Sequence, residues 1–143
     1  MTHQYRSVLH FEKYIVKDIT YKTNEAYTEH NEISLDFDFD AHIQLSEDNQ
    51  EMEVELGVSI FKDSIEKNYP FEMAVNVKGF FYLEIGNERI DTFEANAIAI
   101  LFPYVRAIVS TFTANANVAP VILPPMNLYN YLKNKHNKKK NQD

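Results

Sequence analysis

NAIAILFPYVRAIVSTFTANANVAPVILPPMNL, residues 96–128, is the stretch that decides the fold of this chain. Its first half carries apolar side chains at the spacing of an α-helix, on two faces rather than one. A helix with two apolar faces needs two partners, and we expect a β-sheet and a second subunit. Pro103 should kink this helix or start it afresh, because proline has no N–H to donate. The second half, VAPVILPP at residues 118–125, predicts a stiff extended loop.

The ends of the helical segments follow from side chains that can cap them. Asp91 or Thr92 can cap the long helix. Asn127 can cap a short final helix over about residues 128–134. Residues 133–143, KNKHNKKKNQD, are polar and of low complexity, so we expect a disordered basic tail. Such a tail either keeps the chain soluble or contacts an acidic partner or membrane surface.

Three segments before the helix predict β-strands. Apolar and polar side chains alternate with period two over residues 33–45, over residues 51–60 and over about residues 71–85. Short turn-like segments join them, which implies antiparallel neighbours. A fourth, less regular strand is expected over about residues 4–21. Gly79, inside the third run, indicates a bulge or a close approach of another backbone.

Composition bounds the class of protein. A chain of 143 residues can build one domain with its own core, which we place at residues 1–132. That part carries nine of the 14 Lys and Arg residues and 20 of the 21 acids, and its net charge of −11 disfavours nucleic-acid binding. The chain shows no cysteine, no secretory signal and no clean apolar twenty-residue segment. We therefore expect a cytoplasmic protein without a membrane span.

The clearest polar feature is a ladder of carboxylates at Asp36, Asp38 and Asp40, which share one face of the first alternating run. It is either a solvated face that deters edge pairing, a docking face for a basic partner, or a site for a hard cation. The lack of a glycine-containing ligand loop argues against the cation. The acids within residues 51–55 enlarge the acidic face if the two strands pair, which favours docking over metal binding.

No residue pattern points to catalysis. The five histidines lack metal-ligand spacing, and neither a nucleophile motif nor a glycine-rich phosphate loop occurs. We therefore expect no enzyme activity, no metal and no cofactor. Aromatic residues exceed what a small core must bury, which is common at recognition surfaces. Arg106 in the apolar helix is either a paired or snorkelling side chain or part of an interface ion pair.

The helix and the loop after it resemble the C-terminal half of the SecB protein-export chaperones. In that family an asparagine opens a helix that contains Leu-Phe-Pro-Tyr-x-Arg, and a proline-bounded loop leads to a second helix. The matching residues here are Asn96, Leu101, Phe102, Pro103, Tyr104, Arg106, Pro120, Pro125, Asn127 and Leu128. KDITYKTNEA, residues 17–26, resembles a motif near the family's N-terminus. The likeness spans about residues 14–132.

The resemblance implies an α+β fold, with a four-stranded antiparallel sheet, then a long (kinked) helix and a short C-terminal helix. Members of the family assemble as dimers and dimers of dimers through the long helix. This assembly, carried over to the present chain, places the oligomer interface at Ile100, Tyr104, Ala107, Ile108 and Thr111.

The resemblance also implies a function. SecB-like proteins are ATP-independent chaperones, or holdases, that bind unfolded or pre-secretory polypeptides in an apolar groove and can deliver them to the translocation machinery. The groove lies near the short helix, the loop between the helices and the first crossover. The residues that this nominates are Tyr21, Tyr27, Pro120, Val121, Ile122, Pro124, Pro125, Leu128 and Tyr131.

Docking of the translocation motor ATPase is the part of the resemblance from which this chain departs. The family's acidic contacts for the motor lie on the sheet, and Asp18 matches one of them. Lys22 stands where an acid is common, and Ala74 falls near another acidic position. The carboxylates of Asp36, Asp38 and Asp40 could form a substitute docking face.

Two other functions compete with a general holdase. The first is a dedicated protein-interaction module of the same fold that serves one partner, such as a component of a toxin–antitoxin system. The second is a small-molecule binder or enzyme that uses the apolar cleft, which the missing nucleophile, metal and phosphate motifs disfavour.

Overall fold

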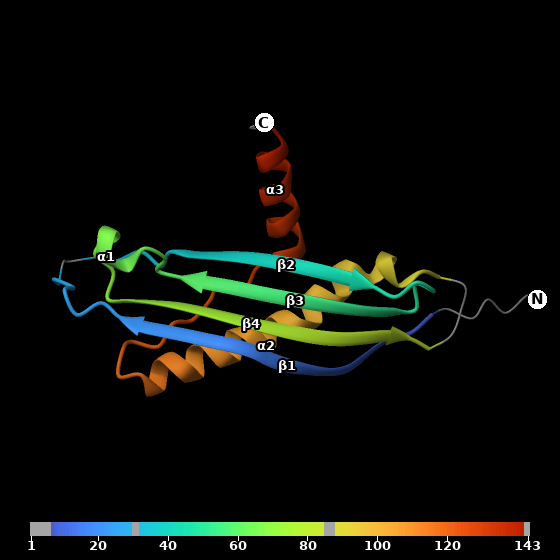
Figure 1. The fold of residues 1–143 in the computed structure, drawn as a ribbon, viewed down its shortest axis with the longest axis horizontal. Helices are drawn as coiled ribbons and strands as arrows, with labels where there is room; N and C mark the ends of the chain where they lie inside the picture. Colours follow the sequence, from blue (N-terminus) through green and yellow to red (C-terminus); the bar gives the residue numbers. More distant parts are fainter. Residues whose placement is uncertain (1–6, 30–31, 85–87, 142–143) are drawn as a thin grey trace, which may run out of the picture.

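A four-stranded antiparallel sheet forms one layer of the protein, and a long helix lies across one of its faces (Figure 1). The computed structural model describes residues 7–29, 32–84 and 88–141. The strands are β1 (Leu9–Thr23), β2 (Phe37–Leu45), β3 (Glu51–Ile60) and β4 (Phe71–Leu83). Their order in space is β1-β4-β3-β2, so β1 and β2 are the two edge strands.

Within the residues that the structure describes, three helices and one 3-10 turn complete the fold. The single turn α1 (Ser64–Lys67) lies in the link between β3 and β4. The 3-10 turn η1 (Ile90–Phe93) leads into α2 (Glu94–Asn115), and α3 (Leu128–Asn141) follows the extended loop. α2 runs behind the sheet, and α3 projects away beyond the β2 edge (Figure 1). The predicted α+β fold class is confirmed.

The first alternating run forms a shorter strand than predicted. β2 begins at Phe37, opposite Ile60 at the end of β3, rather than at residue 33. The chain turns at Phe61, whose φ of 54° is left-handed, so the residues before Phe37 have no strand partner in β3. Ile33 and Leu35 still pack against the core. The period-two pattern of these residues therefore predicts their burial correctly, although they lie before the first residue of β2 that pairs with β3.

The start of α2 also differs from the prediction. η1 precedes the helix, and Phe93 occupies the capping position without a side-chain hydrogen bond. The hydroxyl of Thr92 instead donates to the carbonyl of Arg89 at 2.7 Å. Pro103 lies inside α2, which is continuous from Glu94 to Asn115, so it does not start a new helix.

α3 corrects the prediction of a disordered tail. Asn127 caps it as expected, since its side-chain oxygen accepts the N–H of Asn130 at 3.0 Å. The helix then continues through Asn141 instead of ending near residue 134, so the disorder predicted for residues 133–143 is wrong as far as Asn141. Lysine is a good helix former and no glycine or proline stops the run. Residues 142–143 lie outside the described residues.

α2 packs one apolar stripe against the sheet. Its buried residues are Ala97, Ile98, Leu101, Phe102, Val105, Val109 and Thr113. Across from them the sheet contributes fully buried side chains such as Phe39, Leu56 and Val77. By length and composition the segment Ile90–Asn115 could cross a membrane, with a mean hydropathy of 1.6. Its buried stripe instead faces the sheet, as in the core helix of a folded domain.

At Gly79 the sheet lies close to a side chain of α2. A Cβ atom built there would lie 3.1 Å from Cδ1 of Leu101 and 3.0 Å from Cε2 of Phe81. The register shifts of β1 lie elsewhere, between Phe11 and Lys13 and between Val16 and Asp18. Gly79 therefore makes room for the side chain of Leu101 on α2, whereas the sequence predicted a bulge or the approach of another backbone.

We expect Gly79→Val to lower the free energy of unfolding by about 1–3 kcal/mol, because it overpacks the contact between sheet and helix. Urea denaturation measures the loss. Gly57→Val is the matched control, since a Cβ at Gly57 meets the movable side-chain oxygen of Asn76. An equal loss for both variants would contradict a special role for the approach at Gly79.

Candidate polypeptide-binding surface

An apolar groove of about 710 Å³ lies where three loops meet. These are the loop after α2, the crossover between β1 and β2, and the link between β3 and β4. The groove brings together four of the nominated residues, since Tyr27, Pro120, Val121 and Ile122 all line it. Val118 and Ala119 of the predicted loop line it too, and the lining residues that sequence reasoning missed are Glu29, Ile33, Leu35, Phe61, Pro70, Phe71 and Asn117.

Two polar side chains of α2 hold the loop that forms one wall of the groove. Nε of Arg106 donates to the carbonyl of Leu123 at 2.9 Å. The hydroxyl oxygen of Thr113 accepts the N–H of Val121 at 2.8 Å and donates to the carbonyl of Val109, also at 2.8 Å. Arg106 is thus a paired arginine within its own chain, the first of the two roles considered for it.

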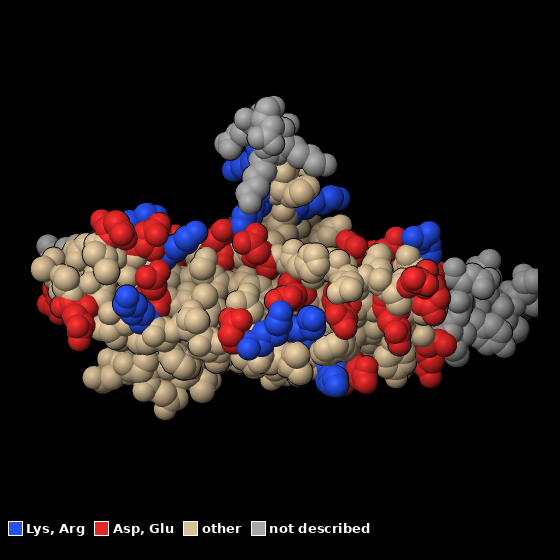
Figure 2. All heavy atoms as spheres, in the orientation of Figure 1, with Lys and Arg blue, Asp and Glu red and all other residues tan. Residues whose placement is uncertain are grey.

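The hydrogen bonds from Arg106 and Thr113 to the loop backbone determine which side chains of the loop point outward. Val121 and Leu123 are buried against the core, whereas Ile122 between them is 71% exposed. This alternation is that of an extended strand with one dry and one wet face. An isoleucine held outward on a fixed backbone leaves apolar surface beside the groove. In Figure 2 the surface over the end of α2 and the start of this loop shows no charged side chain.

The link between β3 and β4 forms the opposite wall and is strained. Phe61, Asp63 and Asn68 all have positive φ, between 54° and 61°. Left-handed backbone is unfavourable for a bulky residue and persists where the surroundings impose it. The ring of Phe61 packs against Tyr69 at 4.8 Å and Phe71 at 5.2 Å between centroids. The strain therefore places an aromatic ring at the groove.

Asn24 ties this link to the end of β1. Its side-chain amide is buried and donates to the carbonyls of Ser64 at 3.1 Å and Tyr69 at 2.9 Å. Its backbone N–H donates to the carbonyl of Pro70 at 3.0 Å. Asn24 belongs to the KDITYKTNEA segment, so this motif positions the walls of the groove rather than lining it directly.

The other nominated groove residues lie elsewhere. Tyr21 packs on Phe71 and Phe112, beside the groove but outside its lining. Leu128 lines a second apolar hollow of about 460 Å³ between α2 and the start of α3. Tyr131 faces β2. Pro124 is half-buried, Pro125 is exposed, and neither lines the two cavities.

Four of the five residues nominated for the subunit interface come together in one place. Tyr104, Ala107, Ile108 and Thr111 line an open apolar depression of about 450 Å³ along α2. Tyr14, Ile19, Phe112 and Asn115 complete its lining, so the patch joins α2 to the edge strand β1. Ile100 is half-buried and lies outside it. We call these eight lining residues the α2–β1 patch.

The nominated acidic residues do not form one face. Asp18 lies on β1 and accepts a hydrogen bond from the Asn76 side chain at 2.7 Å, whereas the ladder of Asp36, Asp38 and Asp40 lies at the β2 end of the sheet. The ladder is also engaged within the chain. Asp36 accepts the hydroxyl of Tyr69 at 2.8 Å, and Lys135 reaches both Asp38 and Asp40.

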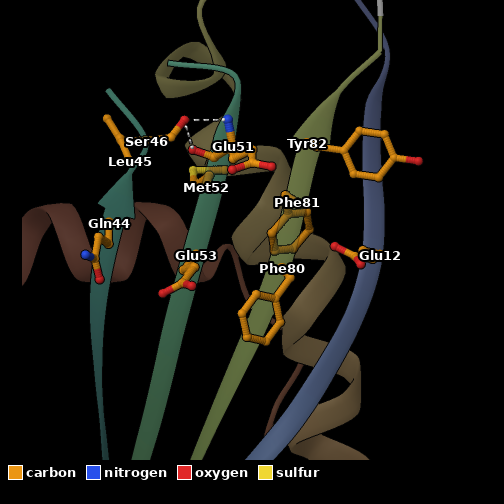
Figure 3. A pocket seen from close by; sticks show the side chains of 10 residues that line it. All are labelled: Glu12, Gln44, Leu45, Ser46, Glu51, Met52, Glu53, Phe80, Phe81 and Tyr82. Carbon is orange, nitrogen blue, oxygen red and sulfur yellow. Dashed lines mark hydrogen bonds between the residues drawn. The ribbon is translucent and has the colours of Figure 1, made fainter. Parts of the chain in front are cut away.

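A smaller hollow of about 220 Å³ opens at the other end of the sheet, around the turn between β2 and β3 (Figure 3). There Ser46 and Glu51 bond to each other across the turn. Glu12 and Glu53 flank the ring of Phe80 in the same view. Its acidic lining sets this hollow apart from the apolar groove. Within the described part of the chain, no group of three His, Asp or Glu side chains could hold a metal ion.

Comparisons with known proteins agree with this geometry. The family model described as preprotein translocase subunit SecB matches residues 2–139, so the chain belongs to the SecB family. An uncharacterized protein of Methanocaldococcus jannaschii is 39% identical over 135 residues, covering 90% of this chain and 85% of its own.

A solved structure shares the fold. It is a Mycobacterium tuberculosis SecB-like chaperone in complex with a ChAD peptide from the HigA1 antitoxin. The TM-score is 0.65 at 12% identity, and the match covers 82% of this chain and 90% of that one. At this identity the likeness shows the fold alone.

We expect Thr113→Val to lower the free energy of unfolding by about 1–3 kcal/mol, because it leaves the buried N–H of Val121 without an acceptor. Amide exchange at Val121 should accelerate as well, and both are measured against the parent protein. Ser110→Ala is the control, because its hydroxyl only bonds back to the carbonyl of Ala107. Unchanged exchange at Val121 in the Thr113 variant would show that the loop is held by other contacts.

Proposed function

We propose that this protein is an ATP-independent holdase that binds unfolded or pre-secretory polypeptides through the apolar groove beside Ile122. The observation that carries the proposal is the groove itself, a wide apolar hollow whose walls are fixed by Arg106, Thr113 and Asn24. A preformed apolar groove binds extended chains without an energy source, because burial of the client's side chains supplies the free energy.

The shape of the groove suits segments rather than whole folded proteins. Its lining is mainly aliphatic, aromatic and proline side chains, with Glu29 and Asn117 as its polar members. Such a lining accepts many apolar sequences, since few polar groups are present to demand particular partners. The family membership supports the same class of function.

A dedicated partner is the second candidate, and one observation favours it. One structural neighbour of this chain is a SecB-like chaperone seen with an antitoxin peptide. We propose the general holdase first because the groove here is broad. A competition assay with unrelated apolar peptides separates the two: comparable affinities support the holdase, and binding of a single peptide supports the dedicated module.

Assembly and delivery complete the proposal. We propose that the α2–β1 patch joins two copies of the chain, as a dimer or a dimer of dimers in the cytoplasm. Docking of the translocation motor stays a prediction from the resemblance. The carboxylates of Asp38 and Asp40 are already engaged by Lys135, which makes the ladder a weaker candidate for a motor contact.

We expect Ile122→Asp to weaken binding of an unfolded client about tenfold, because it places a charge beside the apolar groove. Suppression of light scattering by an aggregating client, together with fluorescence titration of an apolar peptide, measures the effect. Ile65→Asp is the matched control, since Ile65 is 62% exposed on α1 and outside the groove lining. Equal losses in the two variants would remove the groove from the proposal.

We expect Tyr104→Glu or Ile108→Glu to lower the mass of the assembly in solution, because each buries a charge in the proposed subunit contact. Light scattering coupled to size exclusion reports the mass. Ala114→Glu serves as control, since Ala114 is exposed on α2 outside the α2–β1 patch. If the parent protein is itself a monomer, or its mass survives both substitutions, the patch is not the interface.

A further inference from the structure

α3 covers part of the free edge of β2, and Lys135 makes the contacts that hold it there. Its Nζ lies 2.7 Å from a carboxylate oxygen of Asp38, 2.9 Å from one of Asp40 and 2.9 Å from the carbonyl oxygen of Phe39. Tyr131, one helical turn earlier, donates its hydroxyl to Asp38 at 2.7 Å. One face of α3 thus hydrogen-bonds to three consecutive residues of β2, Asp38, Phe39 and Asp40.

The carbonyl that Lys135 reaches is one that an added strand would need. In an antiparallel ladder the N–H and C=O of a residue point to the same side, and successive residues alternate. Asp36 directs its carbonyl toward the β3 side, where it accepts the N–H of Phe61 at 2.8 Å. The carbonyls of even-numbered residues such as Asp36 therefore point toward β3. The carbonyl of Phe39, an odd-numbered residue, points the other way, to the free edge of β2.

We infer that α3 is a strap that closes the β2 edge of the sheet against a further strand, and that Lys135 fastens it. The strand that the strap excludes is β2 of a second copy of this chain. An antiparallel pair centred on Ala41 would set Asp40 opposite His42 and Phe39 opposite Ile43. It would thereby pair a carboxylate with an imidazole on one face and apolar side chains on the other.

The contacts of the strap persist around neutral pH. Burial would raise the pKa of Asp38, but hydrogen bonds from Lys135 and Tyr131 outweigh it and hold the pKa below its usual 3.8. Burial would lower the pKa of Lys135, but Asp38 and Asp40 outweigh it and raise the pKa above 10.5. The Asp38 contribution is lost as pH falls through its lowered pKa, and the Lys135 contribution as pH rises through its raised pKa. Salt is therefore the practical means of loosening the strap.

Cross-linking tests the inference, because the chain has no cysteine of its own. His42→Cys places one thiol on the exposed side of β2, and a short bismaleimide joins two copies that pair through this edge. Adding Lys135→Met keeps the aliphatic stem and removes the charge. We expect the yield of cross-linked dimer to rise about fivefold, the size of change that loss of one charged contact produces.

Lys133→Ala is the matched control, since it removes the same charge from the same helix and only a contact with the ring of Tyr129. Its yield should equal that of the parent. In a second arm Lys135 is kept and salt is raised to about 1 M, where screening should raise the yield. This arm decides the question even where Lys135→Met does not fold. A yield that neither Lys135→Met nor salt changes, or that Lys133→Ala raises equally, would overturn the inference.

Discussion

The packing of α2 against the sheet is the constraint on which the rest of the structure depends. Gly79 lets Leu101 approach the backbone of β4, and the buried stripe of the helix fills the space above the two central strands. Because this face of α2 packs on the sheet, the orientation of its other side chains is also determined. Arg106 and Thr113 then meet the backbone of the following loop, and Tyr104 and Ile108 face outward beside β1. The groove and the α2–β1 patch are two consequences of one helix orientation.

Much of the fold follows from the period of the apolar residues. The alternation in the three regular runs places β2, β3 and β4, and the helical spacing of apolar residues in α2 predicts a helix with one side on the sheet. Boundaries were less predictable, because they depend on contacts distant in sequence. β2 stops at Phe37 because the chain turns at Phe61, and α3 continues past residue 134 while Lys135 binds Asp38 and Asp40. Neither boundary can be predicted from the sequence immediately around it.

The residues of the groove also divide into those that the sequence predicts and those that depend on contacts distant in sequence. Tyr27 and the loop residues Pro120, Val121 and Ile122, which the family resemblance nominates, line one apolar groove, and their role in binding stays a prediction. Phe61 was missed because its position depends on left-handed backbone, which a phenylalanine in sequence does not signal. Thr113 was missed because a threonine near the end of an apolar helix usually bonds to its own helix. It does so here, and it also accepts the N–H of Val121.

The two edges of the sheet differ in a way that bears on assembly. β1 exposes Ile15 and Val16, together with Ile19 of the α2–β1 patch, whereas the β2 edge carries α3. If both edges accepted a strand, copies could add at each end without limit, as in an open filament. With β2 closed, pairing through the β1 side alone is self-complementary and ends at a closed unit. The strap on β2 and the proposed contact through α2 and β1 are therefore complementary requirements for an assembly of finite size.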